Sequence, residues 1–198
     1  MRTHPSRLYI ATGNAGKARE IDACFSALGL RLSVEARAPG HAEETAKDYQ
    51  GNALIKARAL QGELGSPDAW VLSDDSGLEV DALGGEPGVH TARYGGMERL
   101  LKALAGVPES ERTARFIAVL VLLAGGEEYV FKGTCHGHIA VERSGQEGFG
   151  YDPVFIPQGY EAPFAVLSSQ VKSKVSHRAQ ALDALTGWLH GQFGVSFS

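Results

Sequence analysis

The sequence predicts an α/β fold with a mixed sheet, and two observations predict it. In the N-terminal half, short apolar runs alternate with segments of helical periodicity, which is typical of strands that alternate with helices. Farther along, a long apolar run ends at Gly125-Gly126, a pair that favours a tight hairpin turn. The 198 residues, 43% of them hydrophobic, can form a packed core, as one domain or as two lobes that share one sheet.

The first elements are expected in the order strand, helix, strand. Residues 8–12 form an apolar run that ends at a Gly-Asn turn, which predicts a strand. The next segment predicts a helix that ends at Gly29, and residues 32–35 predict the second strand. The apolar positions of that helix, at helical spacing, are Ala18, Ile21, Phe25 and Leu28.

A second helix is expected to begin at Thr45, because an acidic residue, Asp48, follows three positions later as in a capping box. After it, residues 70–73 predict a short strand that leads into two aspartates, and residues 78–83 predict another. The apolar face of the helix carries Tyr49, Ala53, Ala57, Leu60 and Leu64.

The C-terminal half is expected to contain a helix, a hairpin, a loop region and a final helix. Residues 97–105 predict the short helix, and residues 115–124 predict a strand that is buried on both faces. Return strands are expected over residues 128–141. Glycine and proline recur through residues 142–170, which predicts loops, and the last helix is expected to begin near Ser176.

Composition excludes several classes of function. The net charge of −4 gives no general attraction to nucleic acid or to an anionic membrane. No apolar run is long enough to span a bilayer, and the N-terminus lacks the pattern of a signal peptide, so we expect a cytoplasmic protein. Cys24 and Cys135 are expected to be buried thiols in a reducing compartment. His136 and His138 share one strand face but have no evident third ligand, which argues against zinc.

The stretch ATGNAGKARE, residues 11–20, could bind an anion. A turn leads into a helix start there, so backbone N–H groups, the helix dipole and Lys17 could all face a phosphate. It is not a Walker A loop, which needs Gly in place of Ala11 and Ser or Thr in place of Ala18. Taken alone, the stretch could equally be a simple connection.

Two acidic pairs could hold a divalent cation. Asp74 and Asp75 stand at a predicted strand end, where their repulsion needs a cation or a proton to relieve it. They could bind Mg²⁺, or one could act as a general base, but a capped turn is the alternative. Glu43 and Glu44 precede a helix start and could simply favour its dipole, and Lys56 could simply be a surface lysine.

The stretch GFGYDP, residues 148–153, places an aromatic ring between two glycines. Phe149 could stack on a nucleobase, and Asp152 could accept a hydrogen bond from a ring N–H. A tight turn whose aromatic rings fill the core is the alternative.

A basic group precedes and enters the last predicted helix. Cations are unfavourable at a helix N-terminus, and an anionic ligand would remove that conflict. A solvated basic patch is the alternative. The four residues are Lys172, Lys174, His177 and Arg178.

Five stretches in this order resemble the inosine triphosphate pyrophosphatase family: TGNAGK, AEET, DDSGLEVDALGGEPGVHTARY, GFGYDP and SHRAQAL. The resemblance covers nearly the whole chain. It implies a house-cleaning enzyme that hydrolyses dITP, ITP and XTP to the monophosphate and pyrophosphate, with Mg²⁺ assisting attack of water on the α-phosphorus. It also implies that residues 1–198 form one domain of two lobes, with a long central mixed sheet flanked by helices. The active site is then expected in the cleft between the lobes of a homodimer, and a purine nucleotide is the expected partner.

The resemblance also implies the site residues. Asp75 corresponds to the proton acceptor, and the Mg²⁺ ligands are expected among Glu43, Glu44, Asp74 and Asp75. Ser76 is expected to touch the substrate. The phosphates are expected to meet Thr12, Gly13, Asn14, Lys17, Lys56 and Lys172, and the base to meet Phe149, Gly150, Tyr151, Asp152, His177 and Arg178.

The chain departs from the family pattern at two places. After TARYGG, residues 97–99 lead almost directly into LLKAL, where the family usually has a longer acidic stretch, and Thr91 stands where serine is usual. Three rival functions remain: a Maf-type pyrophosphatase with another base preference, a nucleotide sensor that does not hydrolyse, and a structural α/β module. DDSG and SHR argue against the first, and the carboxylate cluster argues against the second.

Overall fold

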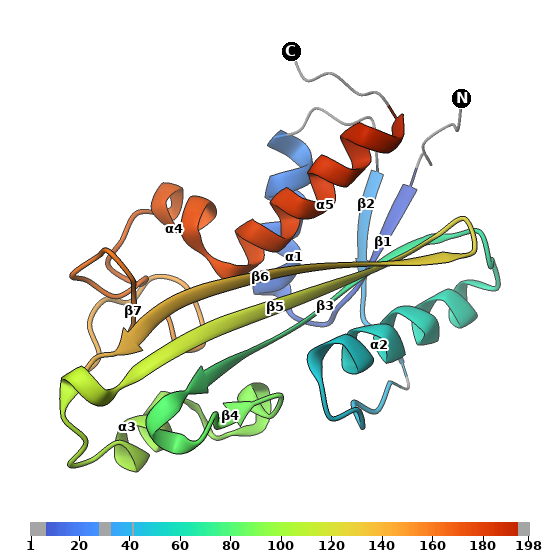
Figure 1. Ribbon diagram of the computed structural model, residues 1–198. Helices are drawn as coiled ribbons and strands as arrows, with labels where there is room; N and C mark the ends of the chain where they lie inside the picture. The colour runs from blue at the N-terminus through green and yellow to red at the C-terminus, as the bar shows by residue number, and fades with distance from the viewer. Residues whose placement is uncertain (1–6, 28–32, 41, 194–198) are drawn as a thin grey trace. The chain divides into compact units, whose positions relative to one another are not determined.

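The computed structural model describes residues 7–27, 33–40 and 42–193 (Figure 1). The chain divides into two compact units. The first contains Met1–Asp75, Val119–Lys132 and Ala181–Ser198, and the second contains Ser76–Ala118 and Gly133–Gln180. The expected helix stop at Gly29, its last apolar position Leu28, and the expected strand start at residue 32 lie outside the described residues.

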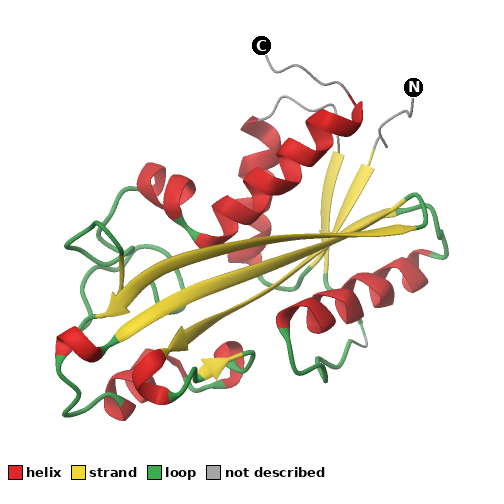
Figure 2. Cartoon of the chain, viewed as in Figure 1, coloured by secondary structure: helices red, strands yellow, loops and turns green. Residues whose placement is uncertain are grey.

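The strands are β1 (Arg7–Ala11), β2 (Ser33–Arg37), β3 (Trp70–Val80), β4 (Pro87–Gly88), β5 (Thr113–Ala124), β6 (Glu127–Ile139) and β7 (Phe155–Pro157). In the described part of the chain they form one seven-stranded sheet with the order β2-β1-β3-β5-β6-β7, and β4 pairs with β3 (Figure 2). Strand β1 pairs in parallel with β2 and β3, whereas β3–β4 and β6–β7 are antiparallel. The mixed α/β sheet predicted from the sequence is therefore confirmed.

The helices are α1 (Ala15–Ala27), α2 (Tyr49–Leu64), α3 (Gly96–Ala103), α4 (Ser169–Val175) and α5 (His177–Phe193). Short 3₁₀ helices cover Asp81–Leu83, Thr91–Arg93 and Glu109–Glu111. None of the helices in the described ranges is long and apolar enough to cross a membrane.

Strand β3 is longer than the sequence predicts, and this changes the setting of the two aspartates. The predicted strand ends at Ser73, but β3 runs without a break through Asp74 and Asp75 to Val80. Aspartate and glycine are poor strand formers. Leu78 and Val80 are fully buried nevertheless, and their burial outweighs that preference. The prediction of a separate strand over residues 78–83 is wrong for the same reason.

Helix α2 begins at a different residue from the one predicted. Its N-cap is Asp48, whose Oδ1 accepts the Gly51 N–H at 2.7 Å, and not Thr45. The helix ends at Leu64, and its C-cap is Gly65, which has φ +61° and donates its N–H to the Gly62 carbonyl. Its apolar face is as predicted: Ala53, Ala57 and Leu60 are fully buried in a cluster with Val71 of β3 and Val121 of β5.

The region predicted as loop, residues 142–170, contains one strand and the first two residues of a helix. Strand β7 adds three residues beside β6, and α4 is capped by Ser168, whose Oγ accepts the Val171 N–H at 3.3 Å. Lys172 and Lys174 consequently lie in the last turn of α4, where a helix dipole favours cations. The predicted conflict with a helix N-terminus was wrong for these two lysines, because a separate helix ends before α5 begins.

The two departures from the family pattern are accommodated in the second unit. The Thr91 hydroxyl accepts the Leu78 N–H at 2.8 Å and donates to the Gly88 carbonyl at 2.6 Å, which joins β3 to β4. Serine could make both bonds through the same hydroxyl. The shortened stretch, residues 97–99, lies inside α3, and the Arg99 guanidinium lies over the Tyr94 ring at 4.6 Å.

Arg112 forms hydrogen bonds that join three segments of the second unit. Its buried guanidinium donates to the carbonyls of Leu104, Val107 and Ala140 at 2.9, 3.0 and 3.1 Å. Leu104 is the C-cap residue of α3, so its carbonyl lies at the helix end, where the dipole also favours a cation.

We expect Arg112→Met to lower the free energy of unfolding by about 2–4 kcal/mol, because it strips buried carbonyls of their donor. Arg115→Met is the matched control. Its ion pair with Glu79 involves a guanidinium side chain that is 41% exposed, so the expected loss is below about 1 kcal/mol. Urea denaturation of both variants measures the difference, and equal losses would contradict the role given to Arg112.

Candidate functional site

The predicted site residues fall into two groups, one in each unit. The first unit holds Thr12, Gly13, Asn14, Lys17, Glu43, Glu44, Lys56, Asp74 and Asp75. The second unit holds Ser76, Phe149, Gly150, Tyr151, Asp152, Lys172, His177 and Arg178.

The predicted phosphate turn follows β1 and opens α1. Asn14 caps the helix: its Oδ1 accepts the N–H groups of Gly16 and Lys17 at 2.9 and 3.1 Å. The Thr12 hydroxyl in turn accepts the Asn14 N–H at 3.1 Å. Gly13 and Asn14 are exposed. Two of the backbone donors expected to face a phosphate are thus already bonded to the cap, so an anion here must displace or join the Asn14 side chain.

Asp74 and Asp75 point to opposite faces of β3, as consecutive residues of a strand must. Lys17 of α1 reaches Asp74, with 2.5 Å between Nζ and Oδ1, and Lys56 of α2 reaches Asp75 at 2.9 Å. Figure 1 shows α1 and α2 on opposite sides of β1 and β3. Each carboxylate therefore has its own ammonium group, and this removes the repulsion that the sequence raised.

Lys56 joins two acidic side chains from different parts of the first unit. Its Nζ donates to Glu44 Oε1 at 3.0 Å and to Asp75 Oδ1 at 2.9 Å, and its side chain is only 11% exposed. It is therefore not a surface lysine. Burial and two carboxylates act on it together, and the result is a raised pKa for Lys56 although burial alone lowers it.

Asp75 has a raised pKa, mainly because burial disfavours its charged form. Lys56 and Lys17 oppose this shift, whereas Glu44 adds to it. The second carboxylate oxygen, Oδ2, is buried and has no hydrogen-bond partner among the described residues. A buried oxygen in this state is typical of a group that takes a proton or a metal ion during function.

The four predicted metal ligands do not gather at one point. Within the described ranges, no three carboxylate, imidazole or thiol side chains lie close enough together to hold a metal. Glu44 and Asp75 both pair with Lys56. Asp74 lies on the other face of β3, and Glu43 is exposed. Mg²⁺ commonly uses one or two carboxylates and completes its shell with water and phosphate, so the Glu44–Asp75 pair fits it.

In the second unit, Lys172 lies against the predicted base-stacking ring. Its Nζ is 4.6 Å from the centre of the Phe149 ring and 2.7 Å from Asp152 Oδ2. The same Oδ2 accepts the Phe149 N–H at 2.8 Å. Phe164, which the sequence analysis did not single out, places its ring 6.0 Å from the same ammonium. Asp152 is buried, so its carboxylate is fixed by these two donors.

Three other predicted residues of this unit, Tyr151, His177 and Arg178, are buried. Arg178 is 3% exposed and donates to Ser76 Oγ at 3.2 Å. His177 stacks on Phe116, with 4.7 Å between ring centres and 12° between planes. Tyr151 belongs to the hydrophobic core of the unit, and its hydroxyl donates to the Thr91 carbonyl at 3.2 Å.

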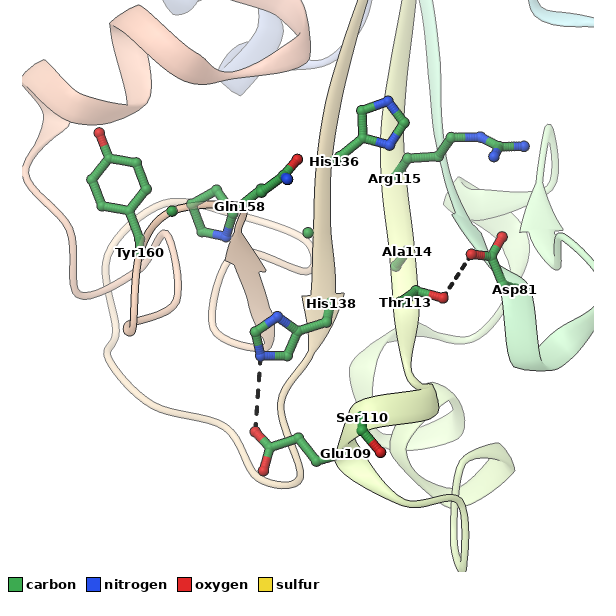
Figure 3. A pocket seen from close by; sticks show the side chains of 13 residues that line it. Asp81, Glu109, Ser110, Thr113, Ala114, Arg115, His136, His138, Gln158 and Tyr160 are labelled. Atoms are coloured by element: carbon green, nitrogen blue, oxygen red, sulfur yellow. Dashed lines mark hydrogen bonds and ion pairs between the residues drawn. The ribbon is translucent and has the colours of Figure 1, made fainter.

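A pocket of about 500 Å³ lies elsewhere in the second unit and contains none of the predicted site residues (Figure 3). His136 and His138 of β6, Arg115 of β5 and Tyr160 line it. Figure 3 shows the His138 ring directed at Glu109, with 3.9 Å between Nε2 and Oε1. The two histidines share a strand face, as the sequence predicts.

Sequence reasoning missed Asn52, which is completely buried on α2 one turn before Lys56. A signal was available. Asn52 falls at helical spacing among the apolar positions Tyr49, Ala53 and Ala57, and a polar side chain on a buried helix face needs a specific partner.

Comparisons with known proteins agree with these motifs. A dITP/XTP pyrophosphatase from Opitutus terrae is 43% identical over 200 residues, covering 92% of this chain and 98% of that protein. The solved Ham1 protein of Staphylococcus aureus is 35% identical with a TM-score of 0.80, over 94% of this chain and 99% of that one. A HAM1 protein structure from Coxiella burnetii is 31% identical with a TM-score of 0.83, over 94% and 100%. The Ham1 family model matches residues 8–188, and the chain therefore belongs to the Ham1 family.

Proposed function

We propose that this protein is a nucleoside triphosphate pyrophosphatase that hydrolyses noncanonical purine nucleotides such as dITP, ITP and XTP. The observation that carries the proposal is the Glu44–Lys56–Asp75 cluster, in which a buried carboxylate with a raised pKa lies beside a fixed ammonium group. A protein that only binds nucleotides has no need of this arrangement. Relatives that carry the name dITP/XTP pyrophosphatase support the substrate class.

The residues of the first unit have separate proposed roles: one accepts a proton, and the others bind the phosphates. Asp75 accepts a proton from water as the water oxygen bonds to the α-phosphorus, and the bond from that phosphorus to the bridging oxygen breaks to release pyrophosphate. Lys17 and Lys56 neutralise charge on the phosphate oxygens, and the Asn14 turn offers backbone donors. The raised pKa of Asp75 makes it a stronger base than an exposed aspartate.

Mg²⁺ is the cofactor that this site fits, with Glu44 and Asp75 as the carboxylates that would hold it. Bound there, it would neutralise charge on the phosphate oxygens and polarise the phosphorus. Glu43 and Asp74 remain predicted ligands. Asp74 would first have to leave Lys17.

The residues of the second unit are proposed to recognise the base. Hypoxanthine and xanthine carry a 6-oxo group and an N1–H, whereas adenine carries a 6-amino group and a bare N1. Arg178 can donate to O6, Asp152 can accept from N1–H, and Phe149 can stack on the ring. Adenine offers Arg178 no acceptor at position 6 and offers Asp152 no N1–H, which is the kind of mismatch that rejects a ligand.

A product assay tests the proposal. Purified protein with Mg²⁺ is given dITP, ATP or GTP, and pyrophosphate is resolved from orthophosphate. We expect dIMP and pyrophosphate from dITP, much faster than any product from ATP or GTP. Orthophosphate would show attack at the γ-phosphorus and contradict the mechanism. Binding of dITP without turnover would identify a sensor instead, and preference for another base would favour the Maf-type alternative.

We further propose a homodimer in the cytoplasm, on the strength of the family resemblance. Light scattering behind a sizing column would give about 42 kDa for the dimer, twice the 21.0 kDa of the chain. A mass near that of one chain at micromolar concentration would contradict it.

Gly148→Ala should impair base selectivity. A Cβ at Gly148 would lie 2.2 Å from Asp152 Oδ2, so the carboxylate must move away from its position beside Phe149. We expect kcat/KM for dITP to fall about tenfold or more, with a smaller change for ATP. Gly159→Ala is the control, because Gly159 has a similar φ of +85° but open space around its Cβ. Equal effects of the two changes would trace the loss to backbone strain alone.

A further inference from the structure

We propose that Gly51 and Asn52, in the first turn of α2, are positioning residues that dock the loop carrying Glu43 and Glu44 and so set the place of Glu44 beside Asp75. The inference rests on the proposed function, because it assigns these residues a part in assembling the Mg²⁺ and phosphate site. Neither residue touches a reacting atom in this scheme. They act through the loop that precedes their helix.

Asn52 makes the first of two contacts with this loop. Its side chain is completely buried, and its Oδ1 accepts the backbone N–H of Ala46 at 3.0 Å. The other amide atom, Nδ2, is buried without a hydrogen-bond partner among the described residues. An unpaired buried donor is unfavourable, so an asparagine here serves through its oxygen, and that oxygen holds the loop two residues after Glu44.

Gly51 makes the second contact, and it does so by lacking a side chain. A Cβ at this position would lie 2.5 Å from the Ala46 Cβ, closer than two carbon atoms can approach. The glycine lies inside a helix, where it is an unfavourable residue. Close approach of the loop explains its presence, and the approach is to the same residue whose N–H Asn52 accepts.

Lys56, one turn farther along α2, makes a further contact with the same loop. Its Nζ donates one hydrogen bond to the Glu44 carboxylate of the loop and another to Asp75. The helix thus holds the loop at two points, through its backbone at Ala46 and through its side chain at Glu44. Without the backbone contact, Glu44 would depend on one flexible side-chain pair, and its oxygens would lose their fixed place near Asp75. Residues that orient a metal ligand in this way typically matter about 10–100-fold for metal affinity or activity.

The test uses three substitutions in the full chain and one matched control. Asn52→Leu removes the acceptor, Gly51→Ala forces the loop away without removing a polar group, and Asn52→Asp keeps an acceptor oxygen for Ala46. The control is Gln61→Leu at the other end of α2, which removes amide donors to the carbonyls of Pro67 and Ala69. Gln61 has no part in the site. Hydrogen exchange of residues 43–48 reports the loop, calorimetric Mg²⁺ titration reports the metal site, and kcat and KM for dITP report the reaction.

We expect Asn52→Leu and Gly51→Ala to speed amide exchange in residues 43–48 and to weaken Mg²⁺ binding about tenfold or more. We also expect kcat to fall while KM for dITP changes less than about threefold, because the residues proposed to bind the nucleobase are unchanged. Asn52→Asp should restore slow exchange. Gln61→Leu should lower thermal stability without changing Mg²⁺ binding.

Unchanged exchange and unchanged Mg²⁺ binding in Asn52→Leu would overturn the inference, even if its stability fell. If Asn52→Leu does not fold, Gly51→Ala decides by the same criteria. If the wild-type protein releases pyrophosphate from no purine nucleotide, the proposed function fails, and the exchange data still show whether the loop is docked.

Discussion

Asp75→Asn should lower kcat for dITP by about 10²–10⁴-fold, the range expected when a general base is removed. An asparagine keeps the size of the side chain and can still accept a hydrogen bond from Lys56, which now holds Oδ1 at 2.9 Å. It cannot accept a proton at neutral pH. The loss should therefore appear in kcat, while dITP binding by the second unit changes little. Steady-state kinetics with pyrophosphate detection gives both values.

Glu79→Gln is the control for that experiment. Glu79 lies on the same strand and pairs with Arg115, which is not one of the predicted site residues. We expect near wild-type turnover from it. Turnover of Asp75→Asn within about fivefold of wild type would remove Asp75 from the role of base.

Lys56→Met should lower kcat/KM by about 10²–10³-fold, since one substitution removes a phosphate-neutralising charge and the partner of two carboxylates. It should also move the acidic limb of the pH–rate profile to higher pH. Lys56 favours the charged form of Asp75, so without it the pKa of Asp75 rises further. Asp75 is a base only above its pKa, and the rate therefore falls at a higher pH than in wild type. A pH series of kcat/KM measures the shift.

The same substitution should cost stability, because breaking a buried ion pair leaves an uncompensated charge, an effect of about 3–5 kcal/mol. Arg58→Met is the matched control on α2. Arg58 is exposed and pairs with the exposed Glu128, so its removal should cost below about 1 kcal/mol and leave the pH profile in place. If the acidic limb of the pH–rate profile of Lys56→Met stays at the wild-type pH, Lys56 does not set the pKa of Asp75.

The local pattern of the sequence determined much of the fold and most of the list of candidate residues. The apolar face of α2, the β5–β6 hairpin at Gly125-Gly126 and the helix over residues 177–193 follow from spacing and turn chemistry, which act between near neighbours. The five motifs in order were enough to predict the family. These features depend on residue type and on the spacing of apolar residues, and both can be read from one sequence.

Only the tertiary structure decided how the charges are distributed. The sequence sets Asp74 and Asp75 side by side, but the continuation of β3 directs them to opposite faces, where helices far apart in the chain supply Lys17 and Lys56. A helix break at Ser176 likewise places Lys172 at the end of α4, where a cation is favourable, and not at the start of α5. The sequence places Asn52 on a buried helix face, but only the fold shows that it accepts a hydrogen bond from Ala46. Each of these partnerships joins separate elements, so pairing across the fold determines them, and local periodicity carries no record of such pairing.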